Sequence, residues 1–208
     1  MDLSAGWKLI LRLAGLGCLV ASLYLFFSVK VSADLRSSER NGEAALFYRQ
    51  PDRDFNERNK CRFVTRFPEN GDPVRLEFAF HSLRPLLQFR LDPGEKPGAW
   101  YRLDDLSVLL YGGLLECRAD TPETAAGIEV NDQLVQDREK LPGISVVATG
   151  PDPQILIPSA VLSRRLNFSA GSLVCPGLFL LGSALLLVPG FLSRRNEKRQ
   201  QESAGGPA

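Results

Sequence analysis

The chain of 208 residues is long enough for one ordinary domain with additional segments. Its 25 basic and 24 acidic side chains nearly cancel, so its charge gives no argument for a nucleic-acid partner. The sequence has no zinc spacing, P-loop, dinucleotide fingerprint or HExxH motif, and its single histidine, His81, lacks an evident set of catalytic partners. We therefore expect no cofactor, no metal ion and no nucleic-acid partner.

An apolar segment follows a short N-terminal stretch, residues 1–12. Residues 13–29 carry no charge, and roughly 17 residues is the lower limit for a helix that crosses the hydrocarbon core. We therefore predict a first transmembrane helix over residues 13–30. Small residues at spacing four would let a helix of a membrane-protein partner approach closely, namely Ala14, Cys18 and Ser22, and beside them Gly17 and Ala21.

A cleaved signal peptide is the competing interpretation of this segment. Val31, Ser32 and Ala33 resemble a small-residue cleavage site. The apolar run is long for a signal peptide, however, and Lys30 interrupts the approach to the site. We therefore favour an uncleaved anchor.

The middle of the chain is predicted to be an antiparallel β-sandwich over residues 44–165, after a polar stalk over residues 31–43. Its segments are short, bounded by turn residues and without helical periodicity, which is typical of such sandwiches. The predicted strands are residues 44–48, 61–65, 74–80, 87–91, 101–110, 114–117, 144–148 and 154–157.

Alternation of apolar and polar residues supports the central strands. Val74, Leu76 and Phe78 share one face of an extended segment, because successive side chains of a strand point to opposite faces. In the segment 101–110 the apolar residues are odd-numbered before Asp104 and Asp105 and mostly even-numbered after them. We therefore predict a β-bulge or sharp bend there.

A second apolar segment, residues 169–192, carries no charge and is predicted to be a second transmembrane helix. Residues 193–208 are predicted to be a basic, disordered, cytoplasmic tail. Basic residues flank both short ends, which places both termini in the cytoplasm and the central domain outside. We therefore expect a two-pass protein of a bacterial inner membrane with a periplasmic or extracellular domain.

A candidate ligand-binding site follows a turn rich in glycine and proline, at Trp100, Tyr101 and Arg102. Aromatic rings stack on sugar faces, and strand alternation exposes at most one ring of Trp100 and Tyr101. A glycan hydrolase would instead need two carboxylates that face each other across a cleft. The candidates for such a pair are Glu77, Asp92, Asp104, Asp105, Glu116 and Asp152.

The cysteines divide by location. Cys61 and Cys117 lie in the central domain and are predicted to form a disulfide, because such a domain would face an oxidising compartment. Two buried free thiols are the alternative. Cys18 and Cys175 are predicted not to pair, because the two helices place them at different depths.

Three segments together resemble a jelly-roll-like β-sandwich domain of bacterial envelope proteins, including membrane glycosyltransferases and polysaccharide-assembly proteins. The resemblance covers about residues 44–158, and the residues that carry it are Phe47, Tyr48, Phe55, Glu57, Arg90, Asp92, Pro93, Leu103, Leu106 and Val108. It implies a non-catalytic accessory protein that binds a glycan or a partner protein during assembly of envelope polysaccharide or glycolipid. The alternatives are a membrane-tethered hydrolase and a structural subunit of a membrane complex.

Overall fold

The computed structural model describes residues 5–51, 54–68, 71–119, 121–137 and 143–204. The chain forms two compact units. One is a β domain, Phe27–Asn167, and the other combines Met1–Phe26 with Phe168–Ala208 and contains two long helices, the helix pair. The predicted fold class is confirmed, because the β domain consists of two antiparallel sheets and the terminal helices are long and apolar.

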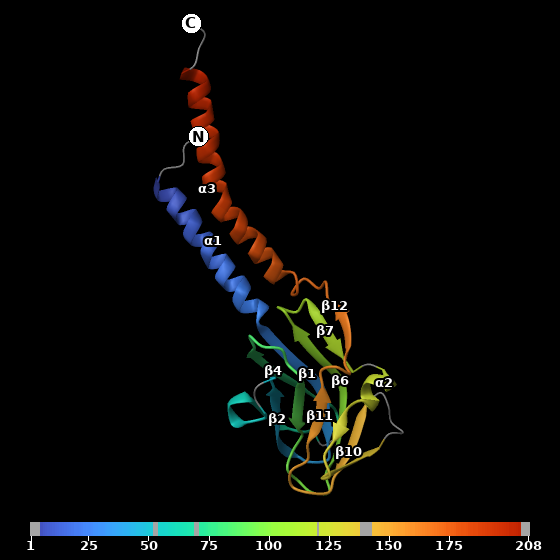
Figure 1. The fold of residues 1–208 in the computed structure, drawn as a ribbon. Coiled ribbons are helices and arrows are strands. Elements are labelled where there is room, and N and C mark those ends of the chain that lie inside the picture. The colour runs from blue at the N-terminus through green and yellow to red at the C-terminus, as the bar shows by residue number, and fades with distance from the viewer. Residues whose placement is uncertain (1–4, 52–53, 69–70, 120, 138–142, 205–208) are drawn as a thin grey trace. The chain divides into compact units, whose positions relative to one another are not determined.

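The first sheet is seven-stranded. Its strands are β1 (Ser28–Ser37), β4 (Val74–His81), β6 (Trp100–Leu110), β7 (Leu115–Arg118), β9 (Leu134–Asp137), β10 (Ile144–Ala148) and β12 (Ser163–Leu166). β1 lies between β4 and β6 and pairs with both along most of its length (Figure 1).

A bulge at Asp105 divides this sheet. Asp105 has φ +49°, in the left-handed region, and the β1–β6 register shifts between Ser32 and Asp34. Before the bulge β6 pairs with β10, and after it β6 pairs with β7. The predicted bulge is therefore confirmed, and it lets one strand hold two different neighbours along the same edge.

The second sheet is five-stranded, in the order β3-β2-β5-β11-β8. These strands are β2 (Asn41–Arg49), β3 (Lys60–Arg66), β5 (Gln88–Asp92), β8 (Glu129–Val130) and β11 (Ile155–Pro158). Two short helices join the strands: η1 (Glu57–Asn59), capped by Asn56, and α2 (Pro122–Ala126). Thr121 begins α2 with a capping box, in which its side chain and that of Thr124 each accept a backbone N–H of the other.

The core lies between the two sheets, and β1 contributes a large share of it. Val31, Ala33 and Leu35 are buried, while the alternate residues of the strand point outward. Full burial of a valine or leucine side chain contributes about 1.5–3 kcal/mol. Residues from both sheets meet these side chains in one cluster, which includes Leu46, Leu76, Phe78, Phe89, Leu91, Tyr101, Leu103, Val108, Ile155 and Ile157.

The polar stalk predicted over residues 31–43 is therefore wrong. This part of the chain forms β1 and the start of β2, and the sandwich begins at Ser28 rather than at residue 44. Ala33, the last residue of the possible cleavage site, lies in the middle of the central strand. Cleavage there would remove half of that strand, which is a physical reason to favour the uncleaved anchor.

The helix pair consists of α1 (Ala5–Phe26) and α3 (Val174–Ala204). The apolar stretches long enough to span a membrane are Gly6–Phe26 and Val174–Phe191. The first helix thus begins earlier and ends earlier than the predicted span of residues 13–30. The disordered tail is also wrong as far as Ala204, because α3 continues to that residue, and residues 205–208 lie outside the described part of the chain.

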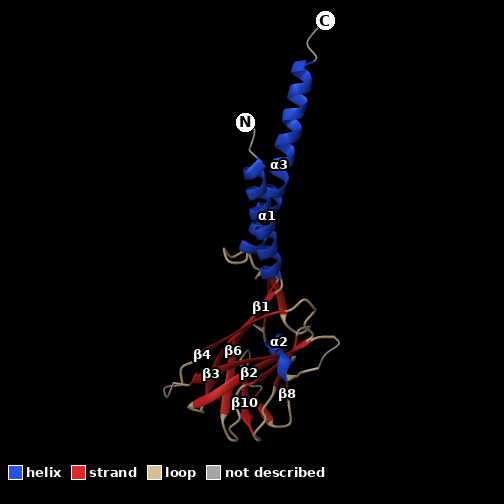
Figure 2. Cartoon of the chain, turned by 90° about the vertical axis from the view of Figure 1, so that its left-hand side faces the viewer, coloured by secondary structure: helices blue, strands red, loops and turns tan. Residues whose placement is uncertain are grey.

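The two helices lie side by side (Figure 1 and Figure 2). They touch through small residues. A Cβ atom built on Gly15 would lie 2.9 Å from the carbonyl oxygen of Gly182, so only hydrogen fits between the backbones. About two turns further along α1, the Ser22 hydroxyl donates to the carbonyl oxygen of Cys175 at 2.9 Å. The small face of α1 therefore holds the chain's own second helix.

The predicted small-residue stripes are partly right. Cys18 and Ser22 lie at this contact, whereas Ala14, Gly17 and Ala21 are exposed. The contact residues Gly15, Cys18 and Ser22 follow the alternating three- and four-residue spacing of a coiled-coil seam, not a constant spacing of four.

The predicted disulfide between Cys61 and Cys117 is absent, and all four cysteines, each within the described residues, are free thiols. Cys61 lies on β3 of the five-stranded sheet, and β3 contacts β4 of the seven-stranded sheet. Cys117 lies on β7, which is in the same sheet as β4 but three strand positions away from it. Neighbouring strands are about 4.8 Å apart, so the two Cα atoms are too distant for a bridge that needs less than about 7 Å. Burial raises the pKa of both thiols, which makes them less reactive.

Candidate ligand-binding groove

The two ends of the β domain differ in what they carry. Both points at which the chain continues into the helices lie at one end, because Ser28 pairs with His81 and Leu166 pairs with Leu115 beside the β6–β7 turn. The opposite end contains the turn from β1 to β2 at residues 38–40 and the start of β6 at Trp100. We call this opposite end the distal end.

Three adjoining hollows among the described residues cross the distal end. Their volumes are about 490, 280 and 400 Å³. Glu39 lines both the first and the second, while Gly71 and Trp100 line both the second and the third. Because they share these lining residues, we treat the three hollows together and call them the distal groove.

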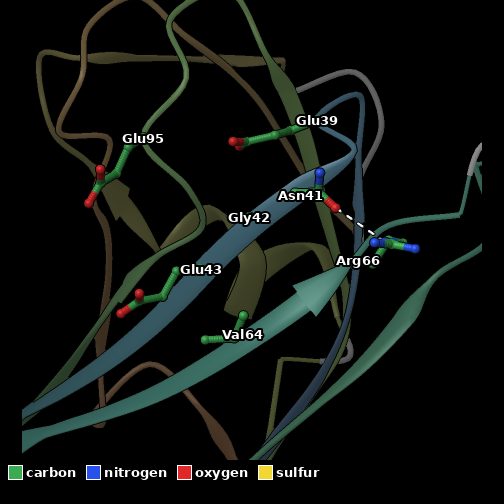
Figure 3. Close-up of a pocket in the computed structure, with 7 residues that line it drawn as sticks. All are labelled: Glu39, Asn41, Gly42, Glu43, Val64, Arg66 and Glu95. Carbon is green, nitrogen blue, oxygen red and sulfur yellow. Dashed lines mark hydrogen bonds between the residues drawn. The ribbon is translucent and has the colours of Figure 1, made fainter.

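The first hollow is acidic (Figure 3). Glu39, Glu43 and Glu95 reach it from the β1–β2 turn, from β2 and from the loop before β6. Asn41 and Arg66 close one side, where the Arg66 Nε donates to the Asn41 side-chain oxygen at 3.3 Å. Glu43 also pairs with Arg62, at 3.3 Å, so this wall is partly neutralised.

Trp100 stands at the middle of the distal groove. Its side chain is 43 % exposed, whereas that of Tyr101 is 1 % exposed. The prediction that alternation exposes only one of these two rings is therefore confirmed. The backbone of Trp100 is held to the β1–β2 turn by the Ser38 hydroxyl, which accepts from its N–H at 3.0 Å, and by the Ser38 N–H, which donates to its carbonyl at 3.1 Å.

Tyr101 is a core residue and offers no stacking surface, which corrects its predicted role in direct binding. Its hydroxyl donates to Glu39 at 2.9 Å, and burial together with this carboxylate raises the pKa of Tyr101. A Cβ atom on Gly94 would come within 2.6 Å of the same carboxylate, so glycine is required beside it. Tyr101 therefore fixes Glu39 where the first two hollows join.

Arg102 lies beside Trp100 on the same outer face of β6, as alternation predicts. Its Nε donates to both oxygens of Asp104, at 3.1 and 2.9 Å. Directly across the strand pair lies Arg36, which also lines the third hollow. Sequence reasoning missed Arg36 because it fell in the supposed stalk, although Val31, Ala33 and Leu35 alternate with polar residues there.

The carboxylates proposed for a hydrolase do not form a facing pair in this groove. None of them is among the described residues that line it. All six have a cation or another donor as a partner: Glu77 has Lys30, Asp92 has Arg90, Asp104 has Arg102, Asp105 has Arg75 and Arg118, Glu116 has Ser107 and Arg118, and Asp152 has Gln154. Nor does any group of three His, Cys, Asp or Glu side chains in the described ranges have the placement of a metal site.

Comparison with known proteins adds no further assignment. No known protein family, curated protein or solved structure matches the chain.

A second cluster lies on the outer face of the five-stranded sheet and unites several residues of the envelope-domain resemblance. The Arg90 guanidinium lies 4.0 Å from the centre of the Phe47 ring and 5.7 Å from that of Phe55. It also donates to Asp92 at 2.9 Å. The cluster fastens the segment before β3 onto the sheet, so these resemblance residues have a structural explanation.

Asp92 in this cluster should make stability depend on pH. Burial raises its pKa to about 6 from an ordinary value of 3.8, more than Arg90 lowers it. Between these values the folded protein binds more protons than the unfolded chain, so the free energy of unfolding falls as pH rises. We expect this contribution to be on the order of 2 kcal/mol and to vanish in Asp92→Asn. Urea unfolding of both proteins from pH 4 to pH 7 measures it, and parallel curves would contradict the assignment.

Proposed function

We propose that the protein is a non-catalytic, membrane-anchored binding module whose distal groove holds a glycan chain during assembly of envelope polysaccharide or glycolipid. The observation that carries the proposal is the partly exposed Trp100, which lines both the second and the third hollow of a groove with mixed polar and apolar walls. An exposed indole with polar side chains in the same hollows is suited to a sugar, which presents an apolar face and a rim of hydroxyls. The length of the groove favours a chain over a single small molecule.

The anchoring supports this role. Two apolar helices flank the β domain in sequence and suggest a two-pass membrane protein. At the end of the domain where the chain continues into them, Leu83, Tyr111 and Leu166 are exposed, and Arg164 and Arg165 lie next to Leu166. Aromatic, apolar and basic side chains together are typical of a surface at a membrane–water interface.

The side of the membrane follows from charge. Lys8 and Arg12 lie in the N-terminal part of the first span, and Arg194 and Arg195 follow the second, which favours cytoplasmic termini and an extracytoplasmic domain in a bacterial inner membrane. Alkaline phosphatase fused after Ala208 should be inactive, and fused within the β domain it should be active. An active C-terminal fusion would reverse the orientation.

The binding role is tested by Trp100→Ala in the full-length protein in detergent, on a panel of envelope-type oligosaccharides. Loss of the stacking surface should weaken the best ligand by at least about ten-fold, or roughly 1.4 kcal/mol. Tyr111→Asn is the matched control, since Tyr111 is 47 % exposed outside the groove and asparagine tolerates its φ of +55°. Equal weakening by both variants, or release of shortened oligosaccharides by the wild type, would contradict the proposal.

A further inference from the structure

We propose that Arg36 and Arg102 form a carboxylate-binding subsite in the distal groove, so that its ligand is an acidic glycan containing uronic acid. This inference rests on the proposed function and names the chemical class of its ligand. Three features of the third hollow carry it: the two arginines in its wall, the lack of a carboxylate partner for Arg36 among the described residues, and the position of Trp100 beside them.

The two arginines are direct cross-strand neighbours. The register of β1 and β6 places Arg36 opposite Arg102, and that of β6 and β10 places Ser145 opposite Arg102 on its other side. Side chains directly opposite in an antiparallel pair lie about 5 Å apart at Cβ, where like charges repel. Both arginines line a hollow of about 400 Å³, with the Arg102 guanidinium turned toward Asp104.

The neighbouring acidic groups do not compensate both charges. Asp104 accepts from Arg102 Nε, and Asp34 accepts from Arg75 at 2.9 Å. Arg36 forms no ion pair with any described residue, and its Nε is buried without an acceptor. The Nε atoms of Arg90 and Arg118 are also buried without an acceptor, but those two arginines have carboxylate partners. What distinguishes Arg36 is the missing carboxylate beside its guanidinium, which leaves a place for an anionic group from the groove.

The position of Trp100 identifies the anion as part of a sugar. Trp100 and Arg102 lie two residues apart on one face of β6, about 7 Å along the strand. This spacing suits a ring stacked on the indole whose carboxyl substituent points at the arginines. Guanidinium groups bind planar carboxylates through two parallel hydrogen bonds. The Ser145 hydroxyl lines the same hollow and can form a hydrogen bond with a neighbouring sugar oxygen.

A pair of ligands that differ only in charge tests the subsite in the full-length protein in detergent. Oligogalacturonate should bind at least ten-fold more tightly than the same oligomer with methyl-esterified carboxyl groups, and this preference should shrink as salt concentration rises. Arg36→Gln should bring the preference close to one while the ester binds as before. Arg49→Gln, which removes an exposed arginine paired with Asp54 elsewhere, should leave it unchanged.

The outcomes separate this inference from the proposed function. Equal binding of acid and ester, both lost in Trp100→Ala, would overturn the subsite and keep the glycan-binding role. A stronger response to sulfated or phosphorylated neutral oligomers than to oligogalacturonate would also overturn the carboxylate assignment. If no oligomer binds, the glycan-binding role fails.

The carboxylate subsite can then be tested separately with free galacturonate in a thermal-shift measurement. Galacturonate should raise the melting temperature of the wild type and not that of Arg36→Gln. No shift in either protein would overturn the subsite.

Discussion

A fragment that begins at Ser28 and ends at Asn167 should fold into the β domain, whereas a fragment that begins at Asp34 should not. The difference is six residues at one end of the chain, yet they form half of a central strand. Val29 and Val31 are buried and pair with Phe80 and Phe78 of β4. Val31 also faces Val108 of β6.

The expected loss is large because three effects act together. Removal of Val29 and Val31 forfeits about 1.5–3 kcal/mol for each buried side chain. It also leaves backbone groups of β4 and β6 without partners and opens the core to water. The sum is comparable to the total stability of an ordinary domain, about 5–15 kcal/mol.

Circular dichroism and cooperative thermal unfolding of the two fragments measure the effect. A fragment of residues 28–162 is the matched control, because it lacks β12, whose residues are mostly exposed at the edge of the sheet. This control should keep a cooperative transition. A cooperative transition in the fragment that begins at Asp34 would show that β1 is dispensable and would return the stalk and the cleaved signal peptide to consideration.

The sequence predicts those strands in which large apolar side chains alternate with polar ones. Leu76 and Phe78 in β4, and Phe89 and Leu91 in β5, are buried as their alternation indicates. The alternation of apolar and polar residues in β6 shifts by one position at Asp105, and this shift likewise locates the bulge. An extra residue in a strand makes the residues after it point to the opposite faces. The sequence does not predict strands that lack such a pattern, such as β8 and β9, because two to four residues are too few to show a period.

β1 was missed for a different reason. The apolar character of α1 continues without interruption through Phe27 and Val29, so hydropathy does not mark the change from helix to strand. Pairing with β4 and β6 fixes that boundary, and these strands lie far away in the sequence. The alternation of Val31, Ala33 and Leu35 was present but weak, because alanine and serine contribute little contrast.

The residues of the groove are still harder to predict from the sequence than the strands. Trp100 and Arg102 could be proposed from a turn followed by a strand, but Arg36 and Ser145 join them only through the registers of three strands. The disulfide prediction failed similarly, because sequence alone does not say that Cys61 and Cys117 belong to different sheets. Contacts along a strand follow from the sequence, whereas contacts across strands require the topology.

Replacing Gly15 by leucine should separate α1 from α3, whereas the same change at Gly17 should not. A Cβ atom on Gly15 would meet the backbone oxygen of Gly182 at 2.9 Å, and backbone cannot rotate away as a side chain can. Gly17 lies two residues along the same helix, and a Cβ atom there meets nothing within 4 Å. The two variants add the same apolar side chain to the same membrane span, so only the contact differs.

A cross-link reports whether the helices remain together. The Ser22 Oγ lies 3.5 Å from the Cys175 Sγ, so Ser22→Cys should form a disulfide with Cys175 under mild oxidation when the other three cysteines are removed. Because overpacking typically costs about 1–3 kcal/mol, Gly15→Leu should slow this cross-link by roughly ten-fold or more. Gly17→Leu should leave the rate unchanged. If Gly17→Leu slowed the reaction as much as Gly15→Leu, the helices would meet through the exposed stripe instead, and the face of α1 that carries Gly15 would be free for another protein.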